Sequence, residues 1–264
     1  MIEKIYSELA ELEQVDAIVL GGSRASGNED KMSDYDLYVY CSDKIPEEKR
    51  REIFEKYCDK MEIGNSFFEY EDNYILSGGT GLDVIYRSLD KLSQFMPYIV
   101  EQHHAMNGYT TCFWHNLITC EIIFDREGKF AEIQKRFSVA YPEELRMNII
   151  RRNLALLCDG LPGYDKQILK AVKRKDIISI NHRTAAFMES YFDIIFALNR
   201  LTHPGEKRLV EICQKKCRLL PDKFEKNISR LFADLYSNTD RVSEDLENIV
   251  SALKKLLRQN GILN

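Results

Sequence analysis

The chain has 264 residues, enough for one large domain or two modest ones, and its hydrophobic content of 44% is sufficient for a core. A net charge of −5 gives no overall basic footprint for long nucleic acid, and no apolar run reaches the roughly 18 residues that a membrane-spanning helix needs. The seven cysteines are scattered without CxxC spacing and the N-terminus lacks a signal-peptide pattern, so we expect a cytoplasmic protein with reduced thiols.

The first 140 residues alternate between helical and strand patterns. Helical spacing over residues 2–14 precedes strands at 17–20 and 36–40, which a glycine-rich turn separates. A proline at position 46 followed by two acids predicts a helix from there to about residue 61. The other predicted elements are strands at 66–70 and 82–86 around the turn SGGTG, a helix at 90–104, and a strand at 117–124 closed by a turn at 125–128. This alternation predicts an α/β (α+β) domain over residues 1–140.

The second half of the chain has a different character. Glycines become rare after about residue 142, and strand patterns disappear. Apolar residues at helical spacing predict helices at 143–158, 166–173, 177–201, 206–217, 222–236 and 243–257. We therefore expect an all-α helical bundle domain over residues 141–264.

The glycine-rich turn after the first strand resembles a phosphate-binding loop only in part. Gly22 and Gly27 have the spacing of the P-loop glycines, but Asn28 and Glu29 stand where that motif requires Lys and Ser or Thr. A P-loop NTPase is therefore excluded. The glycines still allow a close approach of the backbone to an anion, and the neighbouring Arg24 carries a permanent positive charge.

Two aspartates begin the second strand. Because residues i and i+2 of a strand point to the same side, Asp34 and Asp36 place their carboxylates together. Their mutual repulsion would be relieved by a cation, and Mg²⁺ prefers carboxylates together with phosphate oxygens. Asp83, a lone carboxylate at the start of an apolar strand, is the candidate third ligand. The alternative is that Asp34 only caps a turn.

The combination of these segments resembles a known signature. Gly22 and Ser23 after a strand, a spacer of ten residues, Asp34-x-Asp36 on the next strand and Asp83 on a later one are similar to the nucleotidyltransferase superfamily with the DNA polymerase β-like fold. Residues 122–130 and 196–208 extend the similarity to bacterial aminoglycoside and lincosamide nucleotidyltransferases and their uncharacterised relatives. The resemblance implies a catalytic domain with a mixed sheet flanked by helices, followed by a helical bundle.

The resemblance also implies an activity and a set of site residues. The expected reaction is Mg²⁺-dependent transfer of AMP from ATP, or of another NTP's monophosphate, to a hydroxyl of a small acceptor, with an aminoglycoside- or lincosamide-like antibiotic among the candidates. Asp34 and Asp36 would hold two Mg²⁺ ions, and Asp83 would bind metal or accept the hydroxyl proton. The implied nucleotide-binding residues are Gly22, Ser23, Arg24 and, before a helix in the second half, Lys207.

Several alternatives remain open from the residues alone. Lys207 is equally consistent with a solvated helix face, and Glu189 and Asp193 with structural roles rather than acceptor contacts. The chain is also compatible with a toxin–antitoxin-type or regulatory nucleotidyltransferase that modifies a protein partner, or with an inactive nucleotide-binding relative. The expected partners are an NTP and a hydroxyl-bearing small molecule, without long nucleic acid or membrane, and the expected state is a monomer or homodimer.

Overall fold

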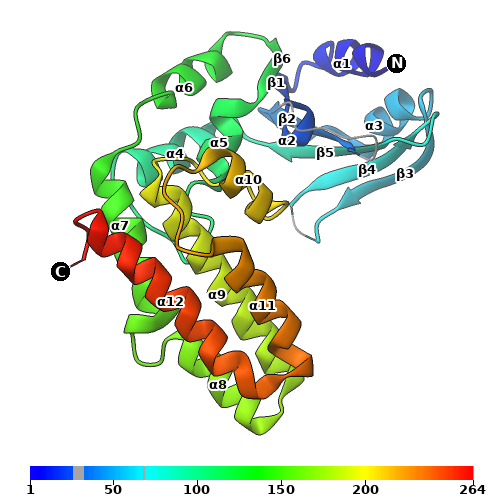
Figure 1. The fold of residues 1–264 in the computed structure, drawn as a ribbon. Coiled ribbons are helices and arrows are strands. Elements are labelled where there is room, and N and C mark those ends of the chain that lie inside the picture. Colours follow the sequence, from blue (N-terminus) through cyan, green and yellow to red (C-terminus); the bar gives the residue numbers. More distant parts are fainter. Residues whose placement is uncertain (26–32, 68, 264) are drawn as a thin grey trace. The chain divides into compact units, whose positions relative to one another are not determined.

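The structure is a computed structural model that describes residues 1–25, 33–67 and 69–263 (Figure 1). The chain forms two compact units, one comprising Met1–Tyr98 and Trp114–Val139, the other comprising Ile99–Phe113 and Ala140–Asn264. A mixed sheet with helices builds the first unit and helices build the second, which confirms the expected fold class. The segment Ile99–Phe113 groups with the helical unit, although it precedes the boundary predicted at residue 140.

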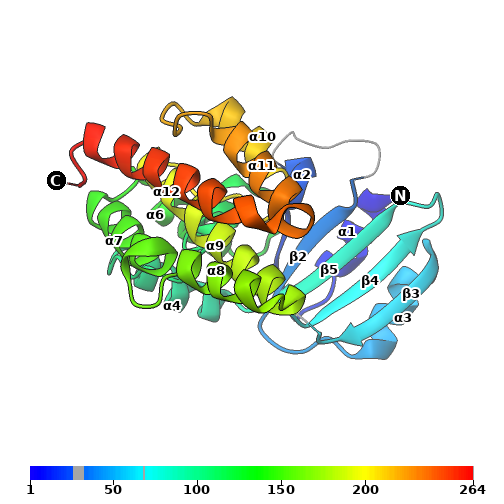
Figure 2. The same cartoon turned by 60° about the horizontal axis from the view of Figure 1, so that its bottom comes forward.

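The first unit is built on a six-stranded sheet with the order β3-β4-β5-β2-β1-β6. Its strands are β1 (Val15–Leu20), β2 (Tyr35–Cys41), β3 (Cys58–Asn65), β4 (Glu71–Leu76), β5 (Gly81–Arg87) and β6 (Glu121–Asp125). The central neighbours β2 and β5 are parallel, and the other described pairs are antiparallel. Figure 2 shows β2, β5, β4 and β3 as successive arrows of this sheet.

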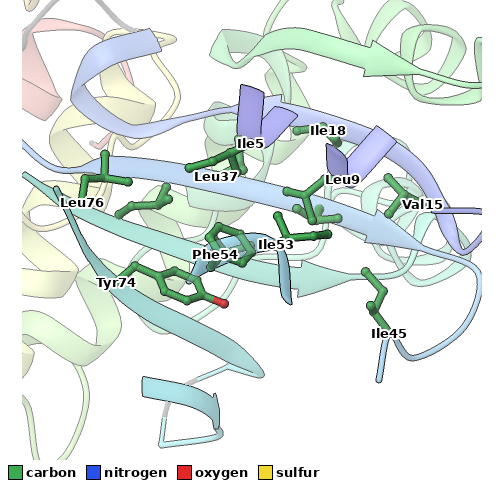
Figure 3. Close-up of a cluster of buried hydrophobic side chains, with 13 residues drawn as sticks. Ile5, Leu9, Val15, Ile18, Leu37, Ile45, Ile53, Phe54, Tyr74 and Leu76 are labelled. Atoms are coloured by element: carbon green, nitrogen blue, oxygen red, sulfur yellow. The ribbon is translucent and has the colours of Figure 1, made fainter. Parts of the chain in front are cut away.

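Helices α1 (Ile2–Ala10) and α3 (Glu47–Phe54) cover one face of the sheet. Ile5 and Leu9 of α1 are fully buried against this face, where Leu37 of β2 belongs to the same cluster (Figure 3). Phe54 of α3 stacks on Tyr74 of β4 with ring centroids 3.9 Å apart. Along β2 and along β4, every second side chain thus points into the core. The alternate side chains of each strand point to the other face.

That other face is partly covered by α6 (Lys129–Phe137), where Phe130 lies 5.0 Å from Tyr40 between ring centroids. Gly128, in the left-handed region at φ 74°, reverses the chain after β6. Asp125 then accepts hydrogen bonds from the backbone N–H groups of Phe130 and Ala131 at 3.3 and 2.8 Å. The turn predicted at 125–128 is therefore a helix start stabilised by a carboxylate at its positive end.

One of these predicted elements in the first unit is wrong and two are partly wrong. The helix expected to reach residue 61 ends at Phe54, and its last predicted residues form strand β3. A strand was predicted at 66–70, but residues 66, 67, 69 and 70 belong to neither β3 nor β4, and residue 68 lies outside the described residues. The strand predicted at 117–124 divides into the end of helix α5 (Cys112–Thr119) and β6. A continuous apolar run does not by itself distinguish a buried helix end from a strand.

The second unit consists of helices, as expected. These are α7 (Glu143–Leu154), which continues into a π-helical turn at Ala155–Asp159, then α8 (Tyr164–Arg174), α9 (Ile177–Leu198), α10 (Leu209–Lys216), α11 (Phe224–Ser237) and α12 (Val242–Gln259). Within this unit α9 packs along α7 and α8, and α12 packs along α11 and α8 (Figure 1). The remaining helix, α4 (Leu89–Val100), follows β5. Among the described residues no helix is both long enough and apolar enough to cross a bilayer.

Candidate active site

Strands β2 and β5 bring the predicted aspartates to one face of the sheet. In their parallel pairing Asp36 is directly opposite Asp83. Asp34 immediately precedes β2 and is two residues from Asp36. Paired residues on neighbouring strands point to the same side, and the alternate residues Leu37 and Val84 belong to the core cluster. The three carboxylates therefore lie on the face away from α1 and α3, near the N-terminal ends of both strands.

The Asp36 carboxylate lies directly over Gly22, the first residue of the short helix α2 (Gly22–Ala25). A Cβ atom at Gly22 would be 1.8 Å from Asp36 Oδ2, and the backbone there has φ +66°. Position 22 thus requires glycine for two separate reasons, its left-handed backbone and its contact with a site carboxylate. The sequence predicts that this glycine allows a phosphate to approach the backbone. The structure shows that it allows the Asp36 carboxylate to do so.

Asp34 has a corresponding glycine on β5. A Cβ atom at Gly81 would be 2.4 Å from Asp34 Oδ1, so this glycine lets an exposed carboxylate lie across the neighbouring strand. Gly81 was not among the predicted site residues. The available signal was its position two residues before Asp83, on the same side of β5.

Arg24 is engaged by the chain just before β2. Its Nε donates to the backbone oxygen of Asp34 at 3.1 Å, and its Nη2 donates to the backbone oxygen of Ser33. The guanidinium carbon lies 4.0 Å from the centroid of the Tyr35 ring, a cation–π distance. Arg24 therefore fixes the backbone that carries Asp34, and its contact with a nucleotide stays a prediction.

An amide row continues the site across β4 and β3. Asn73 of β4 is paired with Asp83, and its Nδ2 donates to Asp83 Oδ1 at 2.8 Å. Asn65 of β3 in turn donates through Nδ2 to Asn73 Oδ1. Neither asparagine was predicted, because residues 58–61 were assigned to a helix and the strand before β5 was placed at 66–70. The polar row therefore extends from Asp36 through Asp83 to the edge strand.

Burial and like charge shape the electrostatics of this face. Burial raises the pKa of Glu71, and the negative charge of Asp83 adds to that shift. Burial also raises the pKa of Tyr38, next to Asp36 on β2, while Arg87 acts in the opposite direction. Arg87 itself donates to both carboxylate oxygens of Glu69, at 2.9 and 2.6 Å. The face is thus acidic around the three aspartates and suited to a cation.

The three carboxylates fit a hard divalent cation by chemistry. All their donors are oxygens, which Mg²⁺ prefers, and Gly22 and Gly81 provide room that a Cβ would fill. They are not gathered as a closed set of ligands: among the described residues, no three His, Cys, Asp or Glu side chains converge closely enough to hold a metal ion. A cation bound to Asp34 and Asp36 would therefore need further oxygens, such as those of a triphosphate.

The other two predicted nucleotide contacts are Ser23 and Lys207. The side chain of Ser23 lies outside the described part of the chain. Lys207 belongs to the second unit and is exposed in the turn before α10, which begins at Leu209 and not at the predicted residue 206. The role of Lys207 in binding a nucleotide stays a prediction.

The second unit contains a buried carboxylate of a different kind. Asp193 on α9 accepts from the backbone N–H and hydroxyl of Thr110, at 3.2 and 2.7 Å, and from Asn153 Nδ2 at 3.0 Å. Burial raises its pKa to about 7. These contacts support the structural interpretation of Asp193. Glu189, one turn earlier, is half-buried, and burial followed by the charge of Glu206 raises its pKa.

Comparison with known families finds a match for the part of the chain that carries Asp34 and Asp36. Residues 3–76 match the family model described as polymerase beta, nucleotidyltransferase. The match includes β1, the Gly22 turn, Asp34, and Asp36 on β2, and it ends before Asp83. It confirms the resemblance found in the sequence and, with it, nucleotidyl transfer as the enzyme class.

The remaining comparisons are less specific. Residues 109–209 match a domain of unknown function, DUF4037, and no curated protein matches the chain. A nucleotidyltransferase-like protein from Exiguobacterium sibiricum 255-15 is 12% identical with a TM-score of 0.43, covering 98% of this chain and 76% of the other. An aminoglycoside 6-adenyltransferase from Bacillus subtilis is 9% identical with a TM-score of 0.28, covering 98% and 90%. Similarity at this level says nothing about the acceptor of this chain.

Proposed function

We propose that the protein transfers a nucleoside monophosphate, AMP from ATP in the simplest case, to a hydroxyl of a small-molecule acceptor, with Mg²⁺ as the cofactor. The observation that carries this proposal is the opposition of Asp36 and Asp83 on the paired strands β2 and β5, with Asp34 beside them. The family match of residues 3–76 supports the reaction class.

Each site residue has a role in this proposal. Asp34 and Asp36 would hold the cation together with phosphate oxygens of the nucleotide. Bound there, Mg²⁺ would neutralise the triphosphate and lower the pKa of the attacking hydroxyl. Asp83 is placed to accept the hydroxyl proton or to complete the ligand set. Positioning and charge neutralisation would carry most of the rate enhancement.

The backbone at Gly22 and Ser23 and the cations Arg24 and Lys207 are proposed to bind the triphosphate. Of these, Gly22 has the clearest support, since its bare Cα lets the Asp36 carboxylate lie against the turn that would bind the phosphates. Arg24 would act mainly through Asp34, whose backbone oxygen accepts its Nε–H. The acceptor is proposed to be a polyhydroxylated small molecule of the aminoglycoside or lincosamide kind, on resemblance alone.

The experiment is a transfer assay with a panel of acceptors. The protein is incubated with each of the four common NTPs, Mg²⁺ and individual aminoglycosides and lincosamides, and pyrophosphate release is measured together with the mass of the acceptor. Acceptor-dependent pyrophosphate release with a matching mass increase supports the proposal. Label appearing on a protein instead would favour the regulatory alternative.

The control is Asp36→Asn, which keeps the side-chain volume over Gly22 while removing the charge. Pyrophosphate release that persists in this variant comes from a contaminant or from another site, and the proposal then fails. Tight NTP binding without any turnover would indicate an inactive relative.

A further inference from the structure

The amide row beside Asp83 goes beyond the residues that the proposed reaction assigns. We infer that Asn73 is a positioning residue for Asp83, and that Asn65 sets the orientation of Asn73; the inference rests on the function proposed above. All three side chains belong to the first unit: Asn73 is paired with Asp83, and Asn65 reaches Asn73 from a shift in the β3–β4 register, where Asn65 itself is paired with Glu71.

The direction of the hydrogen bonds defines the role of Asn73. An asparagine side chain has one acceptor oxygen and one donor nitrogen. Because Asn65 Nδ2 donates to Asn73 Oδ1, the Asn73 NH₂ group must face Asp83, and it lies 2.8 Å from Oδ1. In this arrangement the Asp83 carboxylate receives a hydrogen bond through Oδ1, and the Glu71 carboxylate is a second hydrogen-bond partner of both amides.

The consequence for Asp83 is a carboxylate whose orientation is fixed by a neutral donor. With Oδ1 bound to the amide of Asn73, Oδ2 is the oxygen presented to a cation or an acceptor hydroxyl. A lysine or arginine in place of Asn73 would orient Asp83 equally well but would neutralise it. A neutral donor orients the carboxylate without lowering its affinity for a cation, which is how outer-shell partners act on metal ligands.

The pairing on β4 supports this assignment. The next residue back, Asp72, points to the core face, where it is fully buried among donors. Asn73 points the other way, opposite Asp83 in the register of β4 and β5. The side chains of Asp72 and Asn73 thus lie on opposite faces of the sheet. A substitution of Asn73 can therefore be made without altering the core.

The test measures Mn²⁺ binding, with and without a non-hydrolysable ATP analogue, from the electron paramagnetic resonance signal of free Mn²⁺. Replacing an outer-shell partner typically weakens metal binding by about 10–100-fold, and we expect Asn73→Leu to do so. Asn73→Ser, which retains a donor, is expected to stay within about 3-fold of the wild type. Ser77→Ala is the matched control, because Ser77, directly after β4, also donates a hydrogen bond to a carboxylate of β3, that of Asp59 at 2.9 Å. This variant should leave Mn²⁺ binding unchanged.

A double-mutant cycle separates positioning from a general effect on the fold. If Asn73 acts through Asp83, Asn73→Leu should change Mn²⁺ affinity less than about 2-fold in an Asp83→Ala background. Additive losses, or an Asn73→Leu variant that binds as the wild type does, would overturn the inference. The proposed function has its own readout: if Mn²⁺ with the ATP analogue binds equally to wild type and Asp36→Asn, the metal site itself is wrong. Thermal unfolding of each variant shows that it is folded.

Discussion

Asp72 and Asp83 lie on neighbouring strands of one sheet, and their carboxylates are used in opposite ways. Asp72, on the core face, is fully buried and accepts from Arg50, from the Gly64 backbone N–H at 2.7 Å, and from two tyrosine hydroxyls. Asp83, on the other face, is half-buried, and its hydrogen-bond partner among the described residues is the neutral Asn73. The difference shows how one sheet separates a carboxylate that holds the fold from one that remains available for chemistry.

Asp72 is the centre of a buried hydrogen-bond network. Tyr74 and Tyr86 donate to Asp72 Oδ2 at 2.8 and 2.9 Å, and Arg50 also donates to Tyr70 at 2.6 Å. Burial, together with the neighbouring negative charge of Asp72, raises the pKa of Tyr86, which keeps its hydroxyl a donor. Four donors reach the Asp72 carboxylate, while Arg50 Nε has no hydrogen-bond partner among the described residues, and the network joins α3 to β4 and β5.

The largest effect on the transfer rate is expected from removing a carboxylate on the face that carries Asp83. Asp36→Asn should lower the rate of transfer by about 10³-fold or more, because it removes a charge that acts on the reacting phosphates, equivalent to about 4 kcal/mol of activation free energy. The unfolding free energy should be almost unchanged. Pyrophosphate release with the acceptor found in the panel, together with urea unfolding, measures both. A large loss of stability in this variant would place Asp36 with Asp72 as a structural acid.

The reverse result is expected on the core face. Asp72→Ala leaves the fully buried Arg50 without its carboxylate, and removing one partner of a buried pair typically costs about 3–5 kcal/mol. The transfer rate per folded molecule should fall far less than in Asp36→Asn. Urea unfolding gives the first quantity, and activity normalised to the folded fraction gives the second. If the activity of Asp72→Ala falls as far as that of Asp36→Asn, the two faces are not functionally separate.

A smaller effect on stability is expected at Gly22, where a left-handed backbone position lies in contact with the site carboxylate Asp36. Gly22→Ala should cost about 1–3 kcal/mol through its left-handed backbone and should also reduce transfer, since the new Cβ would lie 1.8 Å from Asp36 Oδ2. Gly79 is the matched control, with φ +84° and no neighbour within 4 Å of its Cβ position. Gly79→Ala should therefore lower stability and leave transfer per folded molecule intact. Equal loss of transfer in both variants would assign the effect at Gly22 to strain alone.

The sequence predicted the shared side of the three candidate carboxylates more accurately than it predicted the strands around them, and their catalytic role stays a prediction. Asp34, Asp36 and Asp83 are identifiable because spacing along single strands determines their side of the sheet. Strand β3 was missed because it is an edge strand: its residues CDKMEIGN carry charges and lack the alternation of a half-buried strand, and they continue the helical pattern of α3. Asn73 and Asn65 were missed because the strand before the SGGTG turn was predicted at 66–70 and not at Glu71–Leu76, and because β3 was predicted as the end of a helix.

The smallest effect is expected at Asp193 in the second unit, a carboxylate that is enclosed like Asp72 but has no cationic partner among its described hydrogen bonds. Its pKa is raised by burial to about 7, above the value near 3.9 expected when unfolded. The folded state therefore binds the proton more tightly. The contribution of Asp193 to stability is present at low pH, declines as the pH rises from about 4 to about 7, and changes little above that range.

Asp193→Asn isolates this contribution, because an amide keeps an oxygen acceptor for Thr110 and does not ionise. Relative to wild type, the variant should gain at least about 1.4 kcal/mol in unfolding free energy between pH 4.5 and pH 8, the equivalent of one pKa unit. Urea unfolding of both proteins at the two pH values gives the difference directly. A parallel pH dependence would mean that the donors Thr110 and Asn153 hold Asp193 ionised throughout. Neutral donors alone would then be enough to keep a buried carboxylate ionised. Arg50 beside Asp72 would in that case join α3 to the sheet and would not be needed to keep Asp72 charged.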